Sequence, residues 1–234
     1  MAHGKLYLIP TPLGEAGLHA LPGYWLPILH RLDYFIAERA KTARRFIKST
    51  GPERPISVLH FEELNKRTDP NALDGFLQPL RDGHDMGLLS EAGCPGVADP
   101  GSEIVARAHR LDIEVVPLVG PSSILLALMA SGMNGQGFSF VGYLSPKQPM
   151  LGKEIQRLEA VARRHKRTQI FIETPYRNRV LIEQLLRTLQ PQTRLCIAAD
   201  LTLPTEYIRT RTVARWREQP PPDLHKRPAL FLLL

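Results

Sequence analysis

M-G-L-L-S-E-A-G-C-P-G-V-A-D-P, residues 86–100, is the stretch of the chain that points most directly to a fold. A short apolar run, Met86–Leu89, passes straight into a loop rich in glycine, proline and small side chains. Open α/β sheets place their ligands where buried parallel strands empty into such loops. Glycine lets the backbone of the loop come close to a bound molecule. The stretch therefore predicts a buried parallel strand followed by a ligand-binding loop.

The same arrangement occurs twice more along the chain. Leu6–Ile9 leads into Pro10–Gly14, and Val115–Val119 leads into Gly120–Ser123. Three apolar strands that feed three small-residue loops favour one shared cleft at one edge of a sheet.

The order of expected elements indicates two domains. Up to residue 118, strands at 6–9, 34–37, 57–59, 86–89 and 114–116 alternate with helices at 25–31, 42–50, 70–81 and 102–110. Alternation of this kind is typical of a mostly parallel sheet covered on both faces. After a helix at 122–130, the strands expected at 138–141, 169–172, 195–199, 206–212 and 229–233 outnumber the helices at 151–165 and 178–189. We therefore expect an α/β fold with a parallel-sheet domain, 1–118, and a mixed-sheet domain, 119–234.

The composition is that of a globular protein with a basic surface. The 234 residues are 43% hydrophobic and 23% charged, and no apolar run approaches the roughly 18–20 residues of a membrane helix. The two cysteines lie far apart, which excludes a CxxC motif and weakly favours a reducing, cytoplasmic compartment. Thirty Lys and Arg against 23 Asp and Glu give a net charge of +7. This charge favours an anionic partner such as nucleic acid, although it also serves solubility alone.

Several common catalytic motifs are absent from the sequence. There is no GxGxxG, no GxxxxGK[ST], no HExxH and no GxSxG, and the eight histidines show no metal-ligand spacing. We therefore expect no metal site. A cleft of small-residue loops with few catalytic groups suits chemistry that depends on positioning. Methyl transfer from an activated sulfonium donor is chemistry of this kind.

The ordered motifs resemble those of the tetrapyrrole methylase family of S-adenosylmethionine-dependent methyltransferases. The likeness is strongest to its ribosomal RNA small subunit methyltransferase I branch. The similar segments are LYLIPTPLG (6–14), FIAE (35–38), LLSEAGCPGVADPG (88–101), VVPLVGPSS (115–123), FVGYLSPK (140–147), IFIETPYR (170–177), AADLT (198–202) and the terminal RPALFLLL.

The resemblance implies a two-domain α/β enzyme, a cytoplasmic homodimer that binds S-adenosylmethionine between its domains. The ribosomal branch methylates a cytidine 2′-hydroxyl in small-subunit RNA, so the likeness also implies an RNA partner. The implied donor contacts are Pro12, Ala92, Gly93, Cys94, Val97, Ser122, Ser123, Glu173, Leu201, Pro228 and Ala229.

The sequence departs from the branch at three motifs. Gly14-Glu15 replaces the usual Gly-Asn, Glu38-Arg39-Ala40-Lys41 replaces Glu-Asp-Thr-Arg, and Ser90–Pro95 reads SEAGCP where SDAGTP is usual. These departures keep two alternatives open. One is a methyltransferase for a tetrapyrrole or another small molecule, and the other is a non-catalytic protein that binds S-adenosylmethionine.

Two glutamates are candidate catalytic residues. Glu38 and Glu91 each follow an expected strand, and a carboxylate there can accept the proton that a 2′-hydroxyl loses. The alternative for each is a surface or capping role.

Four cations are candidate RNA contacts. Lys41, Arg44, Arg45 and Lys48 follow the i, i+3, i+4, i+7 spacing of one helix face, as a phosphate-binding stripe does. A solvated face is the alternative. A second basic cluster, 163–167, lies near a helix end, where the dipole alone favours cations. Tyr143, Tyr176 and Arg177 either hold a substrate or pack in the core or at its rim.

Overall fold

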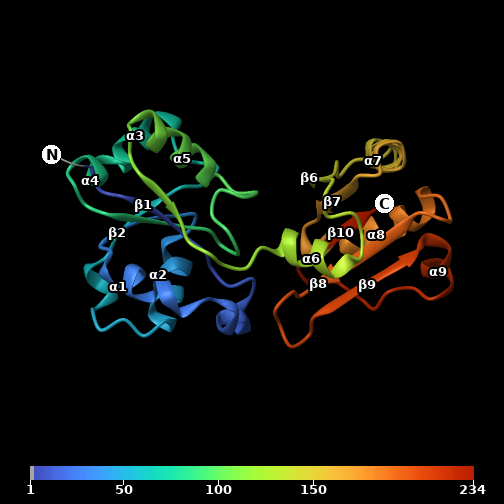
Figure 1. Ribbon diagram of the computed structural model, residues 1–234, viewed down its shortest axis with the longest axis horizontal. Helices are drawn as coiled ribbons and strands as arrows, with labels where there is room; N and C mark the ends of the chain where they lie inside the picture. Colours follow the sequence, from blue (N-terminus) through green and yellow to red (C-terminus); the bar gives the residue numbers. More distant parts are fainter. Residues whose placement is uncertain (1–2) are drawn as a thin grey trace. The chain divides into compact units, whose positions relative to one another are not determined.

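Each half of the chain builds its own five-stranded sheet in the computed structural model, which describes residues 3–234 (Figure 1). The two units are Met1–Ser122 and Ser123–Leu234. The predicted boundary at 118/119 lies in the same connecting loop, between the last strand of unit 1 and the first helix of unit 2.

Unit 1 alternates short strands with short helices. Its elements are β1 (Leu6–Ile9), η1 (Glu15–Ala20), η2 (Gly23–Trp25), α1 (Leu26–Arg31), β2 (Tyr34–Ala37), α2 (Ala40–Ser49), η3 (Ile56–Val58), β3 (His60–Glu63), η4 (Pro70–Ala72), α3 (Leu73–Phe76), α4 (Gln78–Arg81), β4 (Met86–Leu89), α5 (Gly101–Arg110) and β5 (Val115–Pro117).

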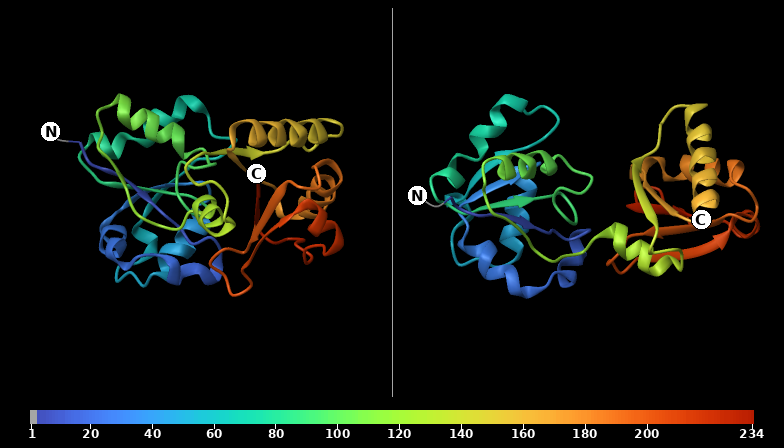
Figure 2. Two further views of the ribbon diagram at one scale, coloured as in Figure 1. Left: turned by 45° about the vertical axis from the view of Figure 1, so that its right-hand side comes forward. Right: turned by 45° about the horizontal axis from the view of Figure 1, so that its top comes forward.

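The sheet of unit 1 is parallel throughout and has the order β3-β2-β4-β1-β5. Successive strand residues point to opposite faces, so the strands supply two cores. Leu6 and Leu88 pack with α3, α4 and α5 on one face. Ile9 and Phe35 pack with α1 and α2 on the other (Figure 1 and Figure 2). The predicted parallel sheet with two covered faces is confirmed.

Unit 2 has longer strands and a mixed sheet. Its elements are α6 (Ser123–Ser131), β6 (Phe138–Tyr143), α7 (Met150–His165), β7 (Thr168–Ile172), η5 (Pro175–Arg177), α8 (Asn178–Thr188), β8 (Arg194–Ala199), β9 (Tyr207–Thr212), α9 (Val213–Glu218) and β10 (Ala229–Leu233).

The C-terminal strand β10 lies at the centre of the second sheet, whose order is β6-β7-β10-β8-β9. It pairs antiparallel with both β7 and β8, whereas β6 and β7 are parallel. One face of the sheet carries a core of Phe171 and Phe231 with apolar residues of α7, α8 and α9. The predicted mixed sheet is confirmed. Within residues 3–234, no helix has both the length and the apolar character needed to cross a membrane.

Two predicted elements of unit 1 are wrong in position or continuity. The strand expected at 57–59 is a 3-10 turn over most of its length, and β3 begins only at His60, where the backbone N–H donates to the carbonyl of Asp33. The helix expected at 70–81 is broken at Leu77. Pro79 explains the break, because proline has no N–H and its ring collides with the carbonyl of the preceding turn.

Candidate functional site

The carboxyl ends of β1, β4 and β5 lie side by side, because β1 pairs in parallel with both other strands. The three small-residue loops therefore meet at one edge of the sheet. Thr11 and Gly93 form a reciprocal backbone bridge, with N–H to O distances of 3.0 and 3.1 Å. The Cys94 thiol donates to the carbonyl of Pro121 at 3.5 Å, which links the second loop to the third. The expectation that the three loops gather in one place is confirmed.

Two glycines allow the three loops to approach this closely. Gly93 has a φ of +76°, a conformation that L side chains rarely adopt. A Cβ at Gly120 would lie 2.2 Å from Cβ of Pro10, so any side chain there would collide with the proline ring. Backbone thus forms the link between the first two loops, whereas the Cys94 thiol links the second loop to the third.

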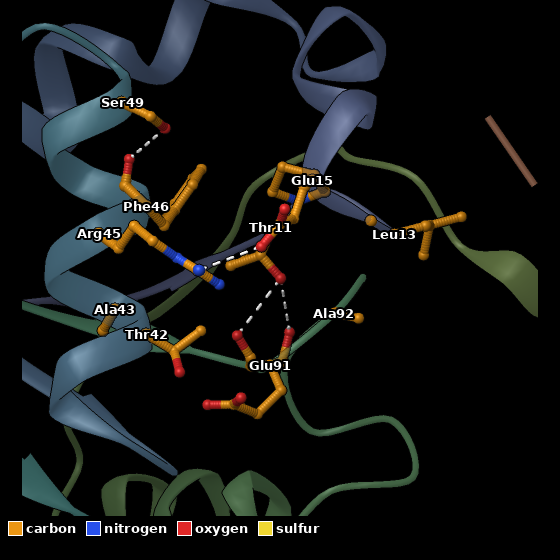
Figure 3. A pocket seen from close by; sticks show the side chains of 13 residues that line it. Thr11, Leu13, Glu15, Thr42, Ala43, Arg45, Phe46, Ser49, Glu91 and Ala92 are labelled. Atoms are coloured by element: carbon orange, nitrogen blue, oxygen red, sulfur yellow. Dashed lines mark hydrogen bonds and ion pairs between the residues drawn. The ribbon is translucent and has the colours of Figure 1, made fainter. Parts of the chain in front are cut away.

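The junction borders a cavity of about 360 Å³ between the β1 loop, the β4 loop and α2 (Figure 3). Its walls are Thr11, Pro12, Leu13, Gly14, Glu15, Thr42, Ala43, Arg45, Phe46, Ser49, Ser90, Glu91 and Ala92. The floor is fixed by buried hydroxyls: Thr11 Oγ1 lies 3.3 Å from Ser90 Oγ, which donates to the carbonyl of Gly93 at 2.9 Å. Ligand pockets in proteins have volumes of roughly 300–1,000 Å³, so this cavity suits a small ligand or part of a larger one.

Glu38 and Glu91 follow neighbouring strands, β2 and β4, and so reach the same sheet edge. Glu91 lines the cavity, whereas Glu38 lies with Asp99 at a smaller recess beside it. Partial burial raises the pKa of Glu38 above its ordinary value, and the negative charges of Glu91 and Asp99 raise it further. Asp99 was missed by the sequence reasoning. Its Oδ1 accepts from the backbone N–H groups of Gly96 and Gly101, both at 2.8 Å, and thereby shapes the loop before α5.

The four cations of the predicted stripe, Lys41, Arg44, Arg45 and Lys48, are exposed along α2. Ala43 and Ile47 on the opposite face are buried against the sheet. Arg45 also lines the cavity and forms an ion pair with Glu15 at 3.0 Å. The guanidinium of Arg44 lies over the ring of Phe61, with its carbon 4.6 Å from the centroid.

In unit 2, the residues implied to contact the donor also gather at a sheet edge. Glu173 follows β7, and Leu201 lies two residues after β8. Pro228 directly precedes β10, which begins at Ala229 and runs antiparallel between those strands. Asp200 joins the last two segments, because its backbone N–H donates to the carbonyl of Pro228 at 2.9 Å. Its carboxylate also accepts from Arg227 Nε at 2.7 Å. The remaining implied contacts, Ser122 and Ser123, lie where the chain passes from the β5 loop into α6.

Glu173 is a buried carboxylate with one oxygen incompletely matched. Its Oε1 accepts from the N–H of Thr174 at 2.7 Å and from the hydroxyl of that residue at 3.2 Å. Its Oε2 is buried and makes no hydrogen bond within residues 3–234, although Arg177 lies 3.3 Å away as an ion pair. The hydroxyl of Thr202, next to Leu201, is similarly buried without a hydrogen-bond partner in the described chain.

Aromatic residues at the same edge are exposed. Tyr143 and Tyr176 are 60% and 68% exposed, which argues against core packing for either. His225 meets the ring of Tyr176 edge-on at 5.9 Å, and the ammonium of Lys226 lies 6.0 Å from the same ring. The sequence reasoning singled out the tyrosines but missed these two partners.

The described side chains favour neither a nucleophilic role for Cys94 nor a metal site. Burial raises the pKa of the Cys94 thiol, which disfavours the thiolate that a nucleophilic cysteine needs. Across residues 3–234, no group of three His, Cys, Asp or Glu side chains is placed to hold a metal ion.

Solved methyltransferases share the fold of this chain. A uroporphyrin-III-C-methyltransferase from Thermus thermophilus superposes with a TM-score of 0.54 at 20% identity, over 98% of this chain and 91% of that one. The methyltransferase CobJ gives a TM-score of 0.64 at 17% identity, over 98% and 93% of the two chains. At these identities, the likeness establishes the fold class.

Sequence comparison establishes the family. The family model of Tetrapyrrole (Corrin/Porphyrin) Methylases matches residues 5–215. The ribosomal RNA small subunit methyltransferase I of Pseudomonas aeruginosa is 31% identical over 92% of this chain and 72% of its own length. Its namesake in Leptospira biflexa is 30% identical over 88% and 80%. The chain belongs to the tetrapyrrole methylase family; it is a methyltransferase, and its methyl donor is S-adenosylmethionine.

Proposed function

We propose that this methyltransferase acts on RNA, and that the acceptor is a ribose 2′-hydroxyl. The observation that carries the proposal is the position of the exposed cations of α2. Arg45 belongs both to that stripe and to the wall of the cavity, so the line of positive charge extends to the rim of a ligand-sized space, and such charge suits phosphate groups. Relatives at about 30% identity are named for methylation of small-subunit ribosomal RNA, which supports the same class of acceptor.

We assign the donor contacts to the residues that the family resemblance implies, which lie at the two sheet edges, each taken by itself. In unit 1, we assign them to Pro12, the backbone of Ala92–Cys94, Val97 and Ser122. Gly93 leaves this backbone uncovered, since it has no Cβ. In unit 2, we assign them to Ser123, Glu173, Leu201 and the start of β10. The buried Oε2 of Glu173 suits an N–H or O–H of S-adenosylmethionine, because it has an ion pair with Arg177 but no hydrogen bond within residues 3–234, and a buried oxygen without a hydrogen bond costs free energy. The residues present therefore fit the donor.

Methyl transfer requires the protein mainly to position the donor and the acceptor and to remove one proton. S-adenosylmethionine supplies a methyl group bonded to a positively charged sulfur. As the bond to the acceptor oxygen forms and the bond to sulfur breaks, the hydroxyl proton must move to a base. We assign that role to Glu91, which lines the cavity, with Glu38 beside it as a second carboxylate.

Methylation of RNA by the purified protein tests the proposal. Small-subunit ribosomal RNA from a strain without this gene is incubated with methyl-labelled S-adenosylmethionine, digested and analysed by mass spectrometry of the nucleosides. We expect one 2′-O-methylated nucleoside to appear. Glu91→Gln should lower the rate roughly 10²- to 10⁴-fold, the usual range for loss of a general base. Donor binding without label in any RNA would instead favour a small-molecule acceptor or a non-catalytic role.

Charge reversal tests the RNA-binding surface separately. Changing Lys41, Arg44, Arg45 and Lys48 to Glu should weaken RNA binding and reduce the slope of log affinity against log salt by roughly one for each phosphate that the variant no longer binds. The matched control reverses Arg163, Arg164, Lys166 and Arg167, which changes the net charge equally at the end of α7. If both quadruple variants change RNA affinity equally, the stripe on α2 is a solvated face with no specific role in RNA binding.

We also propose that the protein is a cytoplasmic homodimer. Leu125 and Met129 of α6 are 50% and 78% exposed, and apolar side chains on one short helix suit contact with a second copy. Light scattering over a range of concentrations measures the mass, and a monomer throughout would contradict the proposal. Fractionation of cells tests the compartment.

A further inference from the structure

The positive charge of the chain is concentrated in unit 2. Residues 123–234 contain 17 Lys and Arg against 8 Asp and Glu, whereas residues 1–122 contain 13 against 15. The positive net charge therefore comes from unit 2, although the stripe on α2 belongs to unit 1. Because a polyanion is attracted most strongly where positive charge is in excess, unit 2 should contribute to the binding of a polyanion such as RNA.

A groove between α7 and α8 lies in this basic unit. The two helices pack against each other over one face of the sheet, and the start of α7 and the end of α8 border a space of about 490 Å³, the α7–α8 groove. Lys153 lines it from α7, and Arg187 lines it from α8. No Asp or Glu is among its lining residues, all of which lie in the described part of the chain. Within residues 3–234, neither cation forms an ion pair, so both charges remain available to a ligand.

Hydrogen bonds between side chains cross the α7–α8 groove. Nε2 of Gln148 donates to Oε1 of Gln184 at 2.9 Å, and Nε2 of Gln184 donates to Oγ1 of Thr188 at 2.8 Å. A primary amide has two N–H groups, so each glutamine keeps one N–H for a ligand. Together with the ammonium of Lys153 and the guanidinium of Arg187, these amides make the groove rich in donors. Phosphate oxygens are negatively charged acceptors, so they match this composition.

A second groove along α8 has a different chemistry. It encloses about 450 Å³, and the carboxylates of Glu183 and Asp223 line it. Its cation, Arg179, already pairs with Glu183 at 3.0 Å. The apolar part of its wall consists of Ile182, Leu186 and Pro220–Pro222. Two carboxylates repel phosphate, so the match to phosphate is a property of the α7–α8 groove and not of α8 as a whole.

We propose that the α7–α8 groove binds the phosphate backbone of the RNA substrate. The inference rests on the proposed RNA methylation and adds a second place where the RNA is held. None of the residues that line the groove belongs to the donor contacts or to the two candidate catalytic glutamates, so the nucleotides bound there are not the one that accepts the methyl group. Backbone contacts of this kind raise affinity and fix the position of an RNA, but they read no sequence.

Charge reversal at the two cations tests the groove. Lys153→Glu combined with Arg187→Glu replaces two attractive contacts by repulsion. The matched control is Arg163→Glu combined with Arg164→Glu, because both arginines are exposed at the opposite end of α7 and the net charge changes equally. Circular dichroism and thermal unfolding establish that each variant folds.

A milder variant keeps the shape of the groove. Gln184→Glu replaces an amide nitrogen by an oxygen, which removes the donor to Thr188 and places a negative charge in the groove. Gln136→Glu is its control, because it makes the same change at an exposed position of unit 2 that does not line the groove.

Filter binding of labelled small-subunit ribosomal RNA at several salt concentrations measures the affinity. For the double groove variant, we expect about tenfold weaker binding at low salt, and a slope of log affinity against log salt that is smaller by roughly one for each lost phosphate contact. Gln184→Glu should weaken binding about threefold, and each control should weaken it about twofold at most, because salt screens distant charges. Calorimetric affinity for S-adenosylhomocysteine and the rate of label transfer at saturating RNA should stay at wild-type values.

The outcomes separate this inference from the proposed function. If the RNA is methylated but each groove variant binds it like its control, the groove is not an RNA site and the inference fails. Unchanged RNA affinity in all four variants would favour an acidic protein as the occupant, and it would overturn the inference as well. A wild type that binds RNA but methylates none would defeat the proposed function. The comparison of groove and control variants would still decide whether the groove binds the RNA backbone.

Discussion

The residues at the candidate edges of the two sheets come from different parts of the strands. In unit 1, all strands are parallel, so every loop at the edge follows the end of a strand. In unit 2, β10 runs against β7 and β8, so the start of one strand lies beside the ends of two others. Local sequence therefore marks the first edge, where apolar runs pass into small-residue loops. It does not mark Pro228 and Ala229, which lie where a strand begins.

The two edges also differ in how they present polar groups. The junction of unit 1 uses backbone at Gly93 and Gly120, together with the hydrogen bond from the Cys94 thiol to the carbonyl of Pro121. The edge of unit 2 offers the carboxylate of Glu173, buried and incompletely hydrogen-bonded. The first edge should therefore be most sensitive to added bulk, and the second to removed charge.

Added bulk in unit 1 should have the largest effect. Gly120→Val places carbon atoms against the ring of Pro10, at a position where a Cβ alone would come within 2.2 Å. Overpacking of this kind costs typically 1–3 kcal/mol, occasionally more. We expect a loss of that size in the free energy of unfolding, together with at least tenfold weaker binding of S-adenosylhomocysteine. Gly23→Ala is the control, because a Cβ there meets no atom within 4 Å. Similar values for the two variants would mean that the junction tolerates bulk.

Removed charge in unit 2 should have the next largest effect. Glu173→Gln is expected to weaken S-adenosylhomocysteine binding by about 10- to 100-fold, since a hydrogen bond to a charged group contributes about 1.5–3 kcal/mol. Calorimetry measures the change. Glu183→Gln is the control, because Glu183 also pairs with an arginine four residues away but is exposed on α8. If both variants bind the ligand like the wild type, Glu173 serves only its ion pair with Arg177.

The pH dependence of stability should reveal the carboxylates beside the cavity of unit 1. The pKa of Glu38 is higher in the folded protein than in the unfolded chain, so the native state binds more protons in the interval between the two values. Stability contributed by this group is therefore present below the unfolded pKa and is lost as pH rises through the folded pKa. Relative to the wild type, Glu38→Gln should gain unfolding free energy as the pH rises above the ordinary pKa of a glutamate, about 4.3.

Denaturant unfolding at several pH values measures this gain. Glu91→Gln should flatten the wild-type dependence, because it removes one of the charges that raise the pKa of Glu38. A constant difference between the wild type and Glu38→Gln at every pH would show that Glu38 titrates alike in both states.

The smallest expected effect concerns the stripe itself. Arg44 lies over Phe61, and an exposed cation–π contact contributes about 0.5–1 kcal/mol. Arg44→Ala should therefore lower the free energy of unfolding by about that amount, whereas Lys48→Ala should change it by less than about 0.5 kcal/mol, as is usual at the surface. Equal stabilities in chemical denaturation would leave Arg44 with no structural role beyond its charge.

The sequence predicts buried, central strands more accurately than it predicts the edge strand of unit 1. Leu6–Ile9, Tyr34–Ala37, Met86–Leu89 and Ala229–Leu233 are predicted to the residue, because central strands give continuous apolar runs. The edge strand β3 reads H-F-E-E, and backbone pairing with β2 determines its position. No side-chain pattern signals such pairing, so this strand is misplaced.

The site was accessible to sequence reasoning in part. Small-residue loops and the helical spacing of the cations are local patterns, and the structure gathers the loops and exposes the cations as expected. The contribution of Phe46 and Ser49 to the cavity was not predicted, because it depends on how α2 packs on the sheet. Which loops and cations bind donor and RNA stays a prediction.

The Thr11–Gly93 bridge has a consequence for sequence divergence. Because this bridge uses N–H and carbonyl groups, it places little requirement on the side chains of neighbouring loop residues, although the Cys94 thiol separately donates to the carbonyl of Pro121. Residues 90–95 read SEAGCP where the ribosomal branch usually has SDAGTP, yet glycine occupies the linking position in both. Mutations can thus accumulate around the bridge while the loop keeps its shape. The preference for an acceptor can therefore change while the backbone of the loop stays the same.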